Sequence, residues 1–229
     1  MTGMRELLNR LRFRFWVLRD SVSDALRGKK HREDIFGRIY SGNQWGDRES
    51  VSGEGSNEAA TQSVRRELPL LFRRHGIRSL LDAPCGDFRW MRGIVDSVDR
   101  YFGVDIVPEL IEHNTQSYAT DRVEFLQADI AADPLPTTDL VLCRDCFIHL
   151  PTRLIKGALK NFRATGAQFL LLTNDRNAES YHDIPIGSFR RINFTRPPFS
   201  FGEPVEAISE SESGERQLCL WRLQDLPLL

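Results

Sequence analysis

The sequence has few of the features that mark membrane, secreted or nucleic-acid-binding proteins. Its apolar runs are all shorter than the roughly 20 residues needed to cross a bilayer, and its basic N-terminus lacks the uninterrupted apolar segment of a signal peptide. Four cysteines in 229 residues are too few for a disulfide framework and favour a reduced, cytoplasmic protein. A net charge of −1 gives no overall attraction to nucleic acid. The length and composition are those of one stable globular domain.

Charge is unevenly distributed along the chain. Residues 1–32 carry nine basic and three acidic residues, a net charge of +6, which leaves −7 on residues 33–229. Apolar residues from Met4 to Ala25 alternate steps of four and three, which predicts an amphipathic helix over residues 4–26 with arginines on its other face, followed by a polar linker. This helix can pack on the domain, dimerise with a second copy, touch an anionic membrane surface or remain a flexible arm. Nucleic acid is not expected as a substrate, because the remaining chain is acidic.

Three short apolar strands are each predicted to end in an acidic residue: Asp82, Asp105 and Asp129. A tight turn containing Gly86 follows the first of them and leads into a helix expected over residues 88–96. Asp105 comes 23 residues after Asp82, close to the spacing at which an acid meets ribose hydroxyls in a βαβ unit. Because parallel strands end at one edge of their sheet, this pattern predicts a site for a nucleotide-like ligand there.

The other predicted elements complete an alternating α/β chain. Residues 36–57 alternate aromatic residues with glycine and serine, which favours a lid over a bound ligand or a surface loop fixed by Trp45. An ordered polar loop is expected over residues 174–199. Further strands are predicted over residues 139–143, 168–173, 205–208 and 217–223, and further helices over residues 58–74, 109–118 and from 151 or 152 to 162.

The motifs at the strand ends resemble those of the class I S-adenosylmethionine (SAM) dependent methyltransferases. Residues 82–87 (Asp-Ala-Pro-Cys-Gly-Asp) resemble the family's first motif, with one glycine where two or three are usual. The resemblance implies a Rossmann-like, seven-stranded, mostly parallel sheet with helices on both faces and an antiparallel C-terminal edge hairpin. It also implies which residues hold SAM: Asp82, Ala83, Pro84, Cys85 and Gly86 under the methionine part, Asp105 and Ile106 at the ribose, Asp129 and Ile130 at the adenine, and Arg144 and Trp45 as further contacts.

The end of the fourth strand is where chemistry is expected, because it lies beside the topological switch point of a doubly wound sheet. His149 follows this strand and is the best candidate for a general base, since its ordinary pKa is near neutrality. Asp145 can orient the histidine or act as the base itself. Each of the two also has a purely structural interpretation, as a helix-start histidine or a loop ion pair. A Mg²⁺ site built from Asp145, His149 and another acid is left open.

A narrower resemblance concerns the acceptor. Residues 49–56, 143–146 and 183–193 together resemble bacterial glycan O-methyltransferases, such as the mycobacterial enzymes that methylate methylmannose polysaccharides. That resemblance implies methyl transfer to a saccharide hydroxyl in polysaccharide biosynthesis. It places the acceptor against the loop of residues 174–199, with these contacts: Tyr181, Asp183, Arg190 and Asn193.

Three rival interpretations remain from the sequence. A small-molecule O- or N-methyltransferase is the nearest alternative, and a non-catalytic methyltransferase-like binding protein is another. A nicotinamide-dependent oxidoreductase is disfavoured, because the single glycine of the first turn does not form the open backbone that a pyrophosphate needs.

Overall fold

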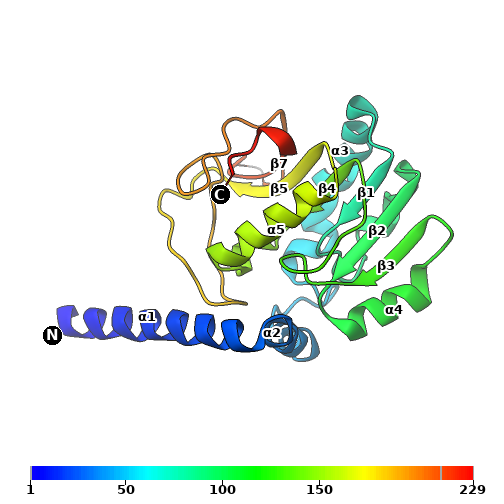
Figure 1. Ribbon diagram of the computed structural model, residues 1–229. Helices are drawn as coiled ribbons and strands as arrows, with labels where there is room; N and C mark the ends of the chain where they lie inside the picture. Colours follow the sequence, from blue (N-terminus) through cyan, green and yellow to red (C-terminus); the bar gives the residue numbers. More distant parts are fainter. Residues whose placement is uncertain (1, 212, 229) are drawn as a thin grey trace.

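A seven-stranded sheet with the strand order β3-β2-β1-β4-β5-β7-β6 is the centre of the molecule (Figure 1). The computed structural model describes residues 2–211 and 213–228. Five strands run parallel, while β7 pairs antiparallel with both β5 and β6, so the predicted fold class and its C-terminal hairpin are confirmed. The strands are β1 (Ser79–Asp82), β2 (Arg100–Asp105), β3 (Val123–Gln127), β4 (Leu140–Cys143), β5 (Phe169–Asp175), β6 (Glu206–Ser209) and β7 (Arg216–Arg222).

Helices cover both faces of this sheet because its central strands are apolar on both sides. In β1, Leu80 packs in a cluster with α3, and the next residue, Leu81, packs in the cluster on the other face with α5. Figure 1 shows α5 lying across the sheet beside β4 and β5. The longer helices are α1 (Thr2–Arg27), α2 (Lys29–Ser41), α3 (Glu58–His75), α4 (Pro108–Tyr118) and α5 (Thr152–Ala164).

The ends of α3 follow the local signals in the sequence. The Asn57 side chain accepts a hydrogen bond from the Ala60 amide at 2.9 Å, which satisfies one of the free amides of the first turn. Gly76 ends the helix in the left-handed conformation, with φ of 65°. Asparagine and glycine are residue types that the capping rules favour at these two positions.

Two predicted elements are wrong. The polar segment after Arg27 is not a linker, because Lys29 begins α2, which buries Arg32 and Ile39. Residues 88–96 do not form an α-helix but two short 3-10 turns. The reason is that Phe88 has a φ of 57°, which no right-handed helix accommodates, and its ring is buried in the core.

α1 extends beyond the sheet from its junction with α2 (Figure 1). The junction is Gly28, whose φ of 55° turns the chain sharply between the two helices. Among the helices of residues 2–211 and 213–228, none is long and apolar enough to cross a membrane.

Candidate functional site

The candidate site is a pocket at the carboxyl ends of β1, β2 and β4. It encloses about 1090 Å³, part of which is open to solvent. The structure brings twelve predicted residues together in its wall: Trp45, Asp82, Pro84, Cys85, Gly86, Asp105, Ile106, Asp129, Ile130, Arg144, Asp145 and His149. Ala83, which was also predicted to hold the cofactor, does not line the pocket. It is buried in the core, and its amide donates to the carbonyl of Leu142 at 2.9 Å.

Backbone hydrogen bonds hold the turn after β1 against β2. The Cys85 amide donates to the Val104 carbonyl at 2.8 Å, and the Gly86 amide donates to Asp105 Oδ2 at 3.3 Å. The other oxygen of Asp105 accepts from the Val107 amide at 3.1 Å. Each carboxylate oxygen therefore keeps a lone pair, and Asp105 lines the pocket, so it can still accept from two further hydroxyls.

Two buried carboxyl groups face this pocket from neighbouring strands. Burial raises the pKa of Asp105 to about 6. Burial also raises the pKa of Asp82 to about 7, against the opposing effects of the Tyr101 hydroxyl, which donates to it at 2.8 Å, and of Arg144. Burial opposes the ionisation of both acids, so a ligand with positive charge, which stabilises the two carboxylates, is favoured there.

Asp129 connects the pocket to the N-terminal helices. Its Oδ1 accepts from the Ala131 amide at 2.9 Å, and its Oδ2 accepts from Arg32 Nε at 2.5 Å. Arg32 is buried and also donates to Asp24 of α1 at 2.6 Å. Asp129, which was predicted to contact the adenine, therefore has one lone pair occupied by Arg32 of α2. Within the described residues, the Ile130 amide makes no hydrogen bond and remains available to a ligand.

The loop between α2 and α3 closes over the first turn. Ser52 Oγ accepts from the Asp87 amide at 2.9 Å, and Ser50 Oγ donates to the Asp87 carboxylate at 2.8 Å. Trp45 and Ser52 line the pocket. Asp87 is therefore bonded to this loop and does not cap a helix.

The lid predicted over residues 36–57 begins within α2, so residues 36–41 are helical and not part of a loop. Phe36 and Tyr40 of this helix line the wall together with Arg32. Their spacing of four residues is a helical signal, but it is embedded in a segment rich in charged residues and glycine.

His149 lies in a 3-10 turn after β4 and lines the pocket. Its Nδ1 is 2.9 Å from the carbonyl oxygen of Ser188. Because a carbonyl only accepts, Nδ1 carries the proton and Nε2 is left with a free lone pair. Nε2 has no hydrogen-bond partner in the part of the chain that is described. Burial lowers the pKa of His149, so the ring is neutral at pH 7.

Aromatic rings flank the imidazole of His149. Trp45 stacks on it with ring centroids 5.1 Å apart. Phe189 lies beside it at 5.9 Å and is 59% exposed. A flat or apolar ligand face next to Nε2 therefore has an aromatic surface to rest on.

Asp145 does not orient His149, in contrast to one of the predicted roles. Its Oδ1 accepts from Arg216 and from Thr173 Oγ1, and its Oδ2 is 3.4 Å from Arg144 Nη1. Burial alone would raise the pKa of Asp145, but Arg144 and Arg216 hold it below the ordinary value. Asp145 is thus a charged partner of arginines, and the carbonyl of Ser188 sets the histidine tautomer.

Arg144 lines the pocket, but its guanidinium is already engaged. Its Nε donates to Glu210 at 2.6 Å, and its charge lies over the ring of Trp90 at 5.5 Å. Only those guanidinium N–H groups of Arg144 that are not bonded to these partners are available for the predicted contact with a cofactor. Glu210 and Arg216 come from the C-terminal hairpin, and no sequence signal associated them with the site.

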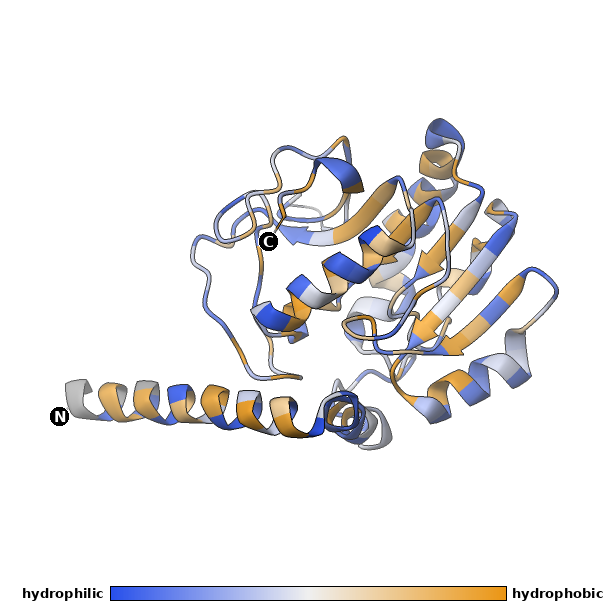
Figure 2. Ribbon diagram, in the orientation of Figure 1, coloured by the Kyte–Doolittle hydropathy of each residue, from blue (hydrophilic) through white to orange (hydrophobic). Residues whose placement is uncertain are grey.

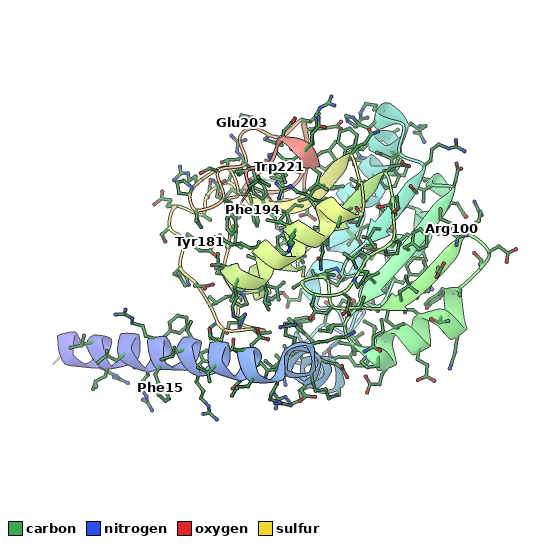
Figure 3. All side chains as sticks on the ribbon, in the orientation of Figure 1. Phe15, Arg100, Tyr181, Phe194, Glu203 and Trp221 are labelled. Carbon is green, nitrogen blue, oxygen red and sulfur yellow. The ribbon has the colours of Figure 1, made fainter. Side chains whose placement is uncertain are left out.

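The predicted acceptor contacts of the loop 174–199 do not line the pocket that the described residues form. The Tyr181 hydroxyl is 2.7 Å from Thr152 Oγ1, and Asp183 accepts from the Thr152 amide at 2.8 Å, so both hold the start of α5. Arg190 is buried over the Tyr181 ring, and Asn193 accepts from the amide two residues further on. Figure 3 shows Tyr181 in the loops beside α5. These four side chains therefore fix the loop.

No group of three or more His, Cys, Asp or Glu side chains is arranged to hold a metal ion among residues 2–211 and 213–228.

The predicted cofactor is compatible with the pocket. SAM carries a ribose and two positive charges, and the pocket offers Asp105 with free lone pairs, a second buried acid in Asp82 and the unbonded amide of Ile130. When bound, SAM supplies an electrophilic methyl group on a sulfonium. The residues that would hold it are those at the ends of β1, β2 and β3.

Residues 80–166 match the family described as a methyltransferase domain. This match covers the first turn, all three strand-end acids and the segment containing His149. No curated protein matches the chain in sequence.

Two solved structures share the fold. One is the 1,6-didemethyltoxoflavin-N1-methyltransferase of Burkholderia thailandensis with bound 1,6-didemethyltoxoflavin and S-adenosylhomocysteine, which is 16% identical with a TM-score of 0.56 over 83% of this chain and 86% of that one. The other is the N-methyltransferase NodS of Bradyrhizobium japonicum WM9, which is 14% identical with a TM-score of 0.51 over 73% of this chain and 98% of that one. At these identities the likeness concerns the fold.

Proposed function

We propose that this chain is a SAM-dependent methyltransferase that methylates a hydroxyl oxygen of a saccharide. The match of residues 80–166 to a methyltransferase domain and the shared fold support this proposal. His149 is the general base of this reaction. Asp105 and Ile106 hold the ribose, Asp129 and Ile130 hold the adenine, and the turn that contains Gly86 holds the methionine part.

The observation that carries this proposal is the hydrogen bond from His149 Nδ1 to the Ser188 carbonyl, which leaves Nε2 free to accept a proton. A hydroxyl is a weak nucleophile until its proton is removed, so oxygen methylation needs a base beside the acceptor. His149 is neutral, its Nδ1 proton is committed to Ser188, and its Nε2 has a free lone pair. As the carbon–oxygen bond forms and the sulfur–carbon bond breaks, Nε2 takes the acceptor proton and S-adenosylhomocysteine leaves.

The surroundings of His149 support a ring-shaped acceptor. Phe189 is more than half exposed beside the imidazole and offers the apolar face on which sugar rings commonly stack. Of the loop residues that were expected to hold sugar hydroxyls, Tyr181, Asp183 and Asn193 make hydrogen bonds within the protein, and Arg190 is buried over the Tyr181 ring. Phe189 is therefore the loop residue that we assign to the acceptor.

The test is a comparison of acceptors with purified full-length protein and SAM. Mannose and methylmannose oligosaccharides, small phenols and heteroaromatic amines are each incubated with and without Mg²⁺, and released S-adenosylhomocysteine is measured. Turnover with an oligosaccharide, lost in Phe189→Ala, supports the proposal. Turnover confined to heteroaromatic amines would identify a small-molecule N-methyltransferase instead, the alternative favoured by the flat aromatic stack of Trp45 on His149.

His149→Gln separates the base from the binding site. The variant is expected to bind S-adenosylhomocysteine as the wild type does, since His149 makes its described hydrogen bond to the loop. Oxygen methylation should then fall by about 10²- to 10⁴-fold. An unchanged rate would remove His149 from the mechanism while leaving the methyltransferase class intact.

A further inference from the structure

An uncovered apolar stripe runs along the outer face of α1. Its members are all between 50% and 81% exposed, and they are Leu7, Leu8, Leu11, Phe15, Leu18, Val22 and Leu26. Steps of three and four residues place them on one face of the helix. Figure 2 shows hydrophobic residues recurring along the whole of α1, which extends away from the sheet. A contiguous apolar surface of this length marks an interaction site.

The opposite face of α1 holds the helix on the rest of the molecule. Asp20 accepts from the Ile186 amide at 3.1 Å, and Asp24 accepts from Arg32 at 2.6 Å and lies 3.1 Å from Arg153. The labelled Phe15 lies on the side of α1 that faces away from the sheet (Figure 3). The stripe is therefore fixed in an outward direction by the buried acids of the same helix.

Arginines border this stripe on both sides. Arg12 and Arg19 directly follow stripe residues on one side, and Arg14 precedes Phe15 on the other; all three are exposed. The acids Asp20 and Asp24 are buried on the docked face, so they do not neutralise this border. The exposed half of α1 thus combines an apolar centre with a cationic rim.

This charge pattern disfavours a second copy as the partner. Leu8, Leu11, Phe15, Leu18 and Val22 follow the a and d positions of a heptad, so two copies of the helix would pair along them. The flanking e and g positions would then set arginines of one copy against arginines of the other. Like charges at these positions repel, whereas an anionic surface would attract all of them at once.

A hollow between α1 and α2 lies beside the arginine border. It is lined by Trp16, Arg19 and Arg38, and also by Arg27 and His31, which are paired with Asp34 and Asp20. Arg19 and Arg38 are exposed, and Trp16 offers the amphipathic ring that is favoured at membrane–water interfaces.

We propose that α1 lies in the interface of an anionic phospholipid bilayer, with its apolar stripe in the acyl boundary and its arginines at the headgroups. The helix holds the methyltransferase domain at the membrane surface through its docked face. This proposal is independent of the acceptor, because it rests only on α1 and α2.

Co-sedimentation of the full chain with vesicles tests the proposal. Binding is expected to vesicles of phosphatidylglycerol and phosphatidylcholine and to be much weaker to phosphatidylcholine alone. Arg12→Gln with Arg19→Gln should lower the partition coefficient about 25-fold, since each arginine near an anionic surface contributes about fivefold. Phe15→Glu with Leu18→Glu should lower it by more than about tenfold, through the lost apolar insertion.

Matched control variants keep the test specific. Val205→Glu changes an apolar side chain of the domain that is 47% exposed, and Arg92→Gln removes an exposed cation of the domain. Both should bind vesicles as the wild type does. All four variants change only exposed side chains. Binding of S-adenosylhomocysteine should therefore persist in each of them, which would show that each variant is folded.

Two results would overturn the proposal. One is the same vesicle binding by the wild type and both α1 variants. The other is a wild type that binds no vesicles but forms a concentration-dependent dimer in analytical ultracentrifugation, with the dimer lost in the Phe15→Glu, Leu18→Glu variant. That second result would assign the stripe to another copy of the chain.

Discussion

Replacing Asp105 with asparagine should stabilise the ligand-free fold and weaken cofactor binding in the same variant. Asp105 is buried at the end of β2, and burial raises its pKa to about 6 from an ordinary value of 3.8. The folded state therefore binds the proton more tightly than the unfolded state, so stability is highest below pH 3.8 and is lost as the pH rises through 6. At pH 8 the ionised carboxylate costs about 3 kcal/mol of unfolding free energy, at 1.36 kcal/mol per pKa unit.

An asparagine at this position stays neutral and removes that cost. Its one side-chain oxygen still accepts from the Val107 amide. Its NH₂ group, however, cannot accept from the Gly86 amide, and the loss of that hydrogen bond lowers the free energy of unfolding by about 1–2 kcal/mol. The net expectation at pH 8 is a gain of about 1–2 kcal/mol. Near pH 4 the wild-type carboxyl group is protonated and its cost is mostly gone, so the variant should be about 1 kcal/mol less stable than the wild type; urea unfolding at both pH values measures the two differences.

The affinity of Asp105→Asn for S-adenosylhomocysteine should change in the opposite direction. If Asp105 accepts from the ribose hydroxyls, the loss of charge costs about 3 kcal/mol, or about 100-fold in Kd at pH 8. Wild-type affinity should fall as the pH drops below about 6, where the carboxyl group becomes protonated. Isothermal titration calorimetry between pH 5 and pH 8 measures both effects.

Asp139→Asn is the matched control for this prediction. Asp139 is also an aspartate at a strand end, but it precedes β4 and accepts from the amides of Arg78 and Ser79 at 2.9 and 2.8 Å. Its replacement should lower stability by about 1–3 kcal/mol and leave the affinity unchanged. The reasoning is refuted if Asp105→Asn instead loses stability at pH 8 and binds S-adenosylhomocysteine like the wild type.

Three further changes test other parts of the site. The lowered pKa of His149 predicts that the wild-type rate is constant above pH 7 and falls at lower pH, which a pH–rate profile measures. The contribution of the neutral His149 to the free energy of unfolding should be complete above pH 6.5 and decline below it, which urea unfolding measures. Gly86→Ala places a Cβ 2.3 Å from a serine hydroxyl of the lid at a φ of 54° and should cost about 1–3 kcal/mol, whereas Gly93→Ala, with open space around its Cβ, should cost little in the same thermal denaturation. Arg32→Gln breaks two buried ion pairs and should cost about 3–5 kcal/mol, and the exposed Arg38→Gln should stay within about 0.5 kcal/mol; equal losses would contradict the assignment of Arg32.

Local chemistry explains why much of the fold was predictable. A short apolar run such as residues 140–143 is typical of a strand buried on both faces, and it is the central strand of the sheet. Asn57 and Gly76 act on amides and carbonyls within a few residues, so their capping roles are visible in the sequence. The acids that follow β1 to β3 meet at one edge for the same reason, because parallel register alone aligns those ends.

Contacts over long sequence distances explain what was missed. The segment after Arg27 looks like a linker because of its charge, but Arg32 is held in a buried position by Asp129, which lies 97 residues away. Asp145 was a reasonable partner for His149 by proximity in sequence, yet Arg216 of the C-terminal hairpin bonds it, and the carbonyl of Ser188 takes its place. Phe88 likewise leaves its helix pattern because three aromatic rings of the core surround it.

These long-range contacts also change where the chain divides. A division at the end of the basic segment, between residues 32 and 33, would cut through α2, whose Arg32 bonds Asp129 and whose Phe36 and Tyr40 line the pocket. The sharp change of direction is at Gly28, and only α1 lies before it. A pocket completed by α2 therefore needs the chain from residue 29 onward. The face of α1 that carries the stripe is left to an outside partner, while Asp24 of its other face shares Arg32 with the cofactor pocket.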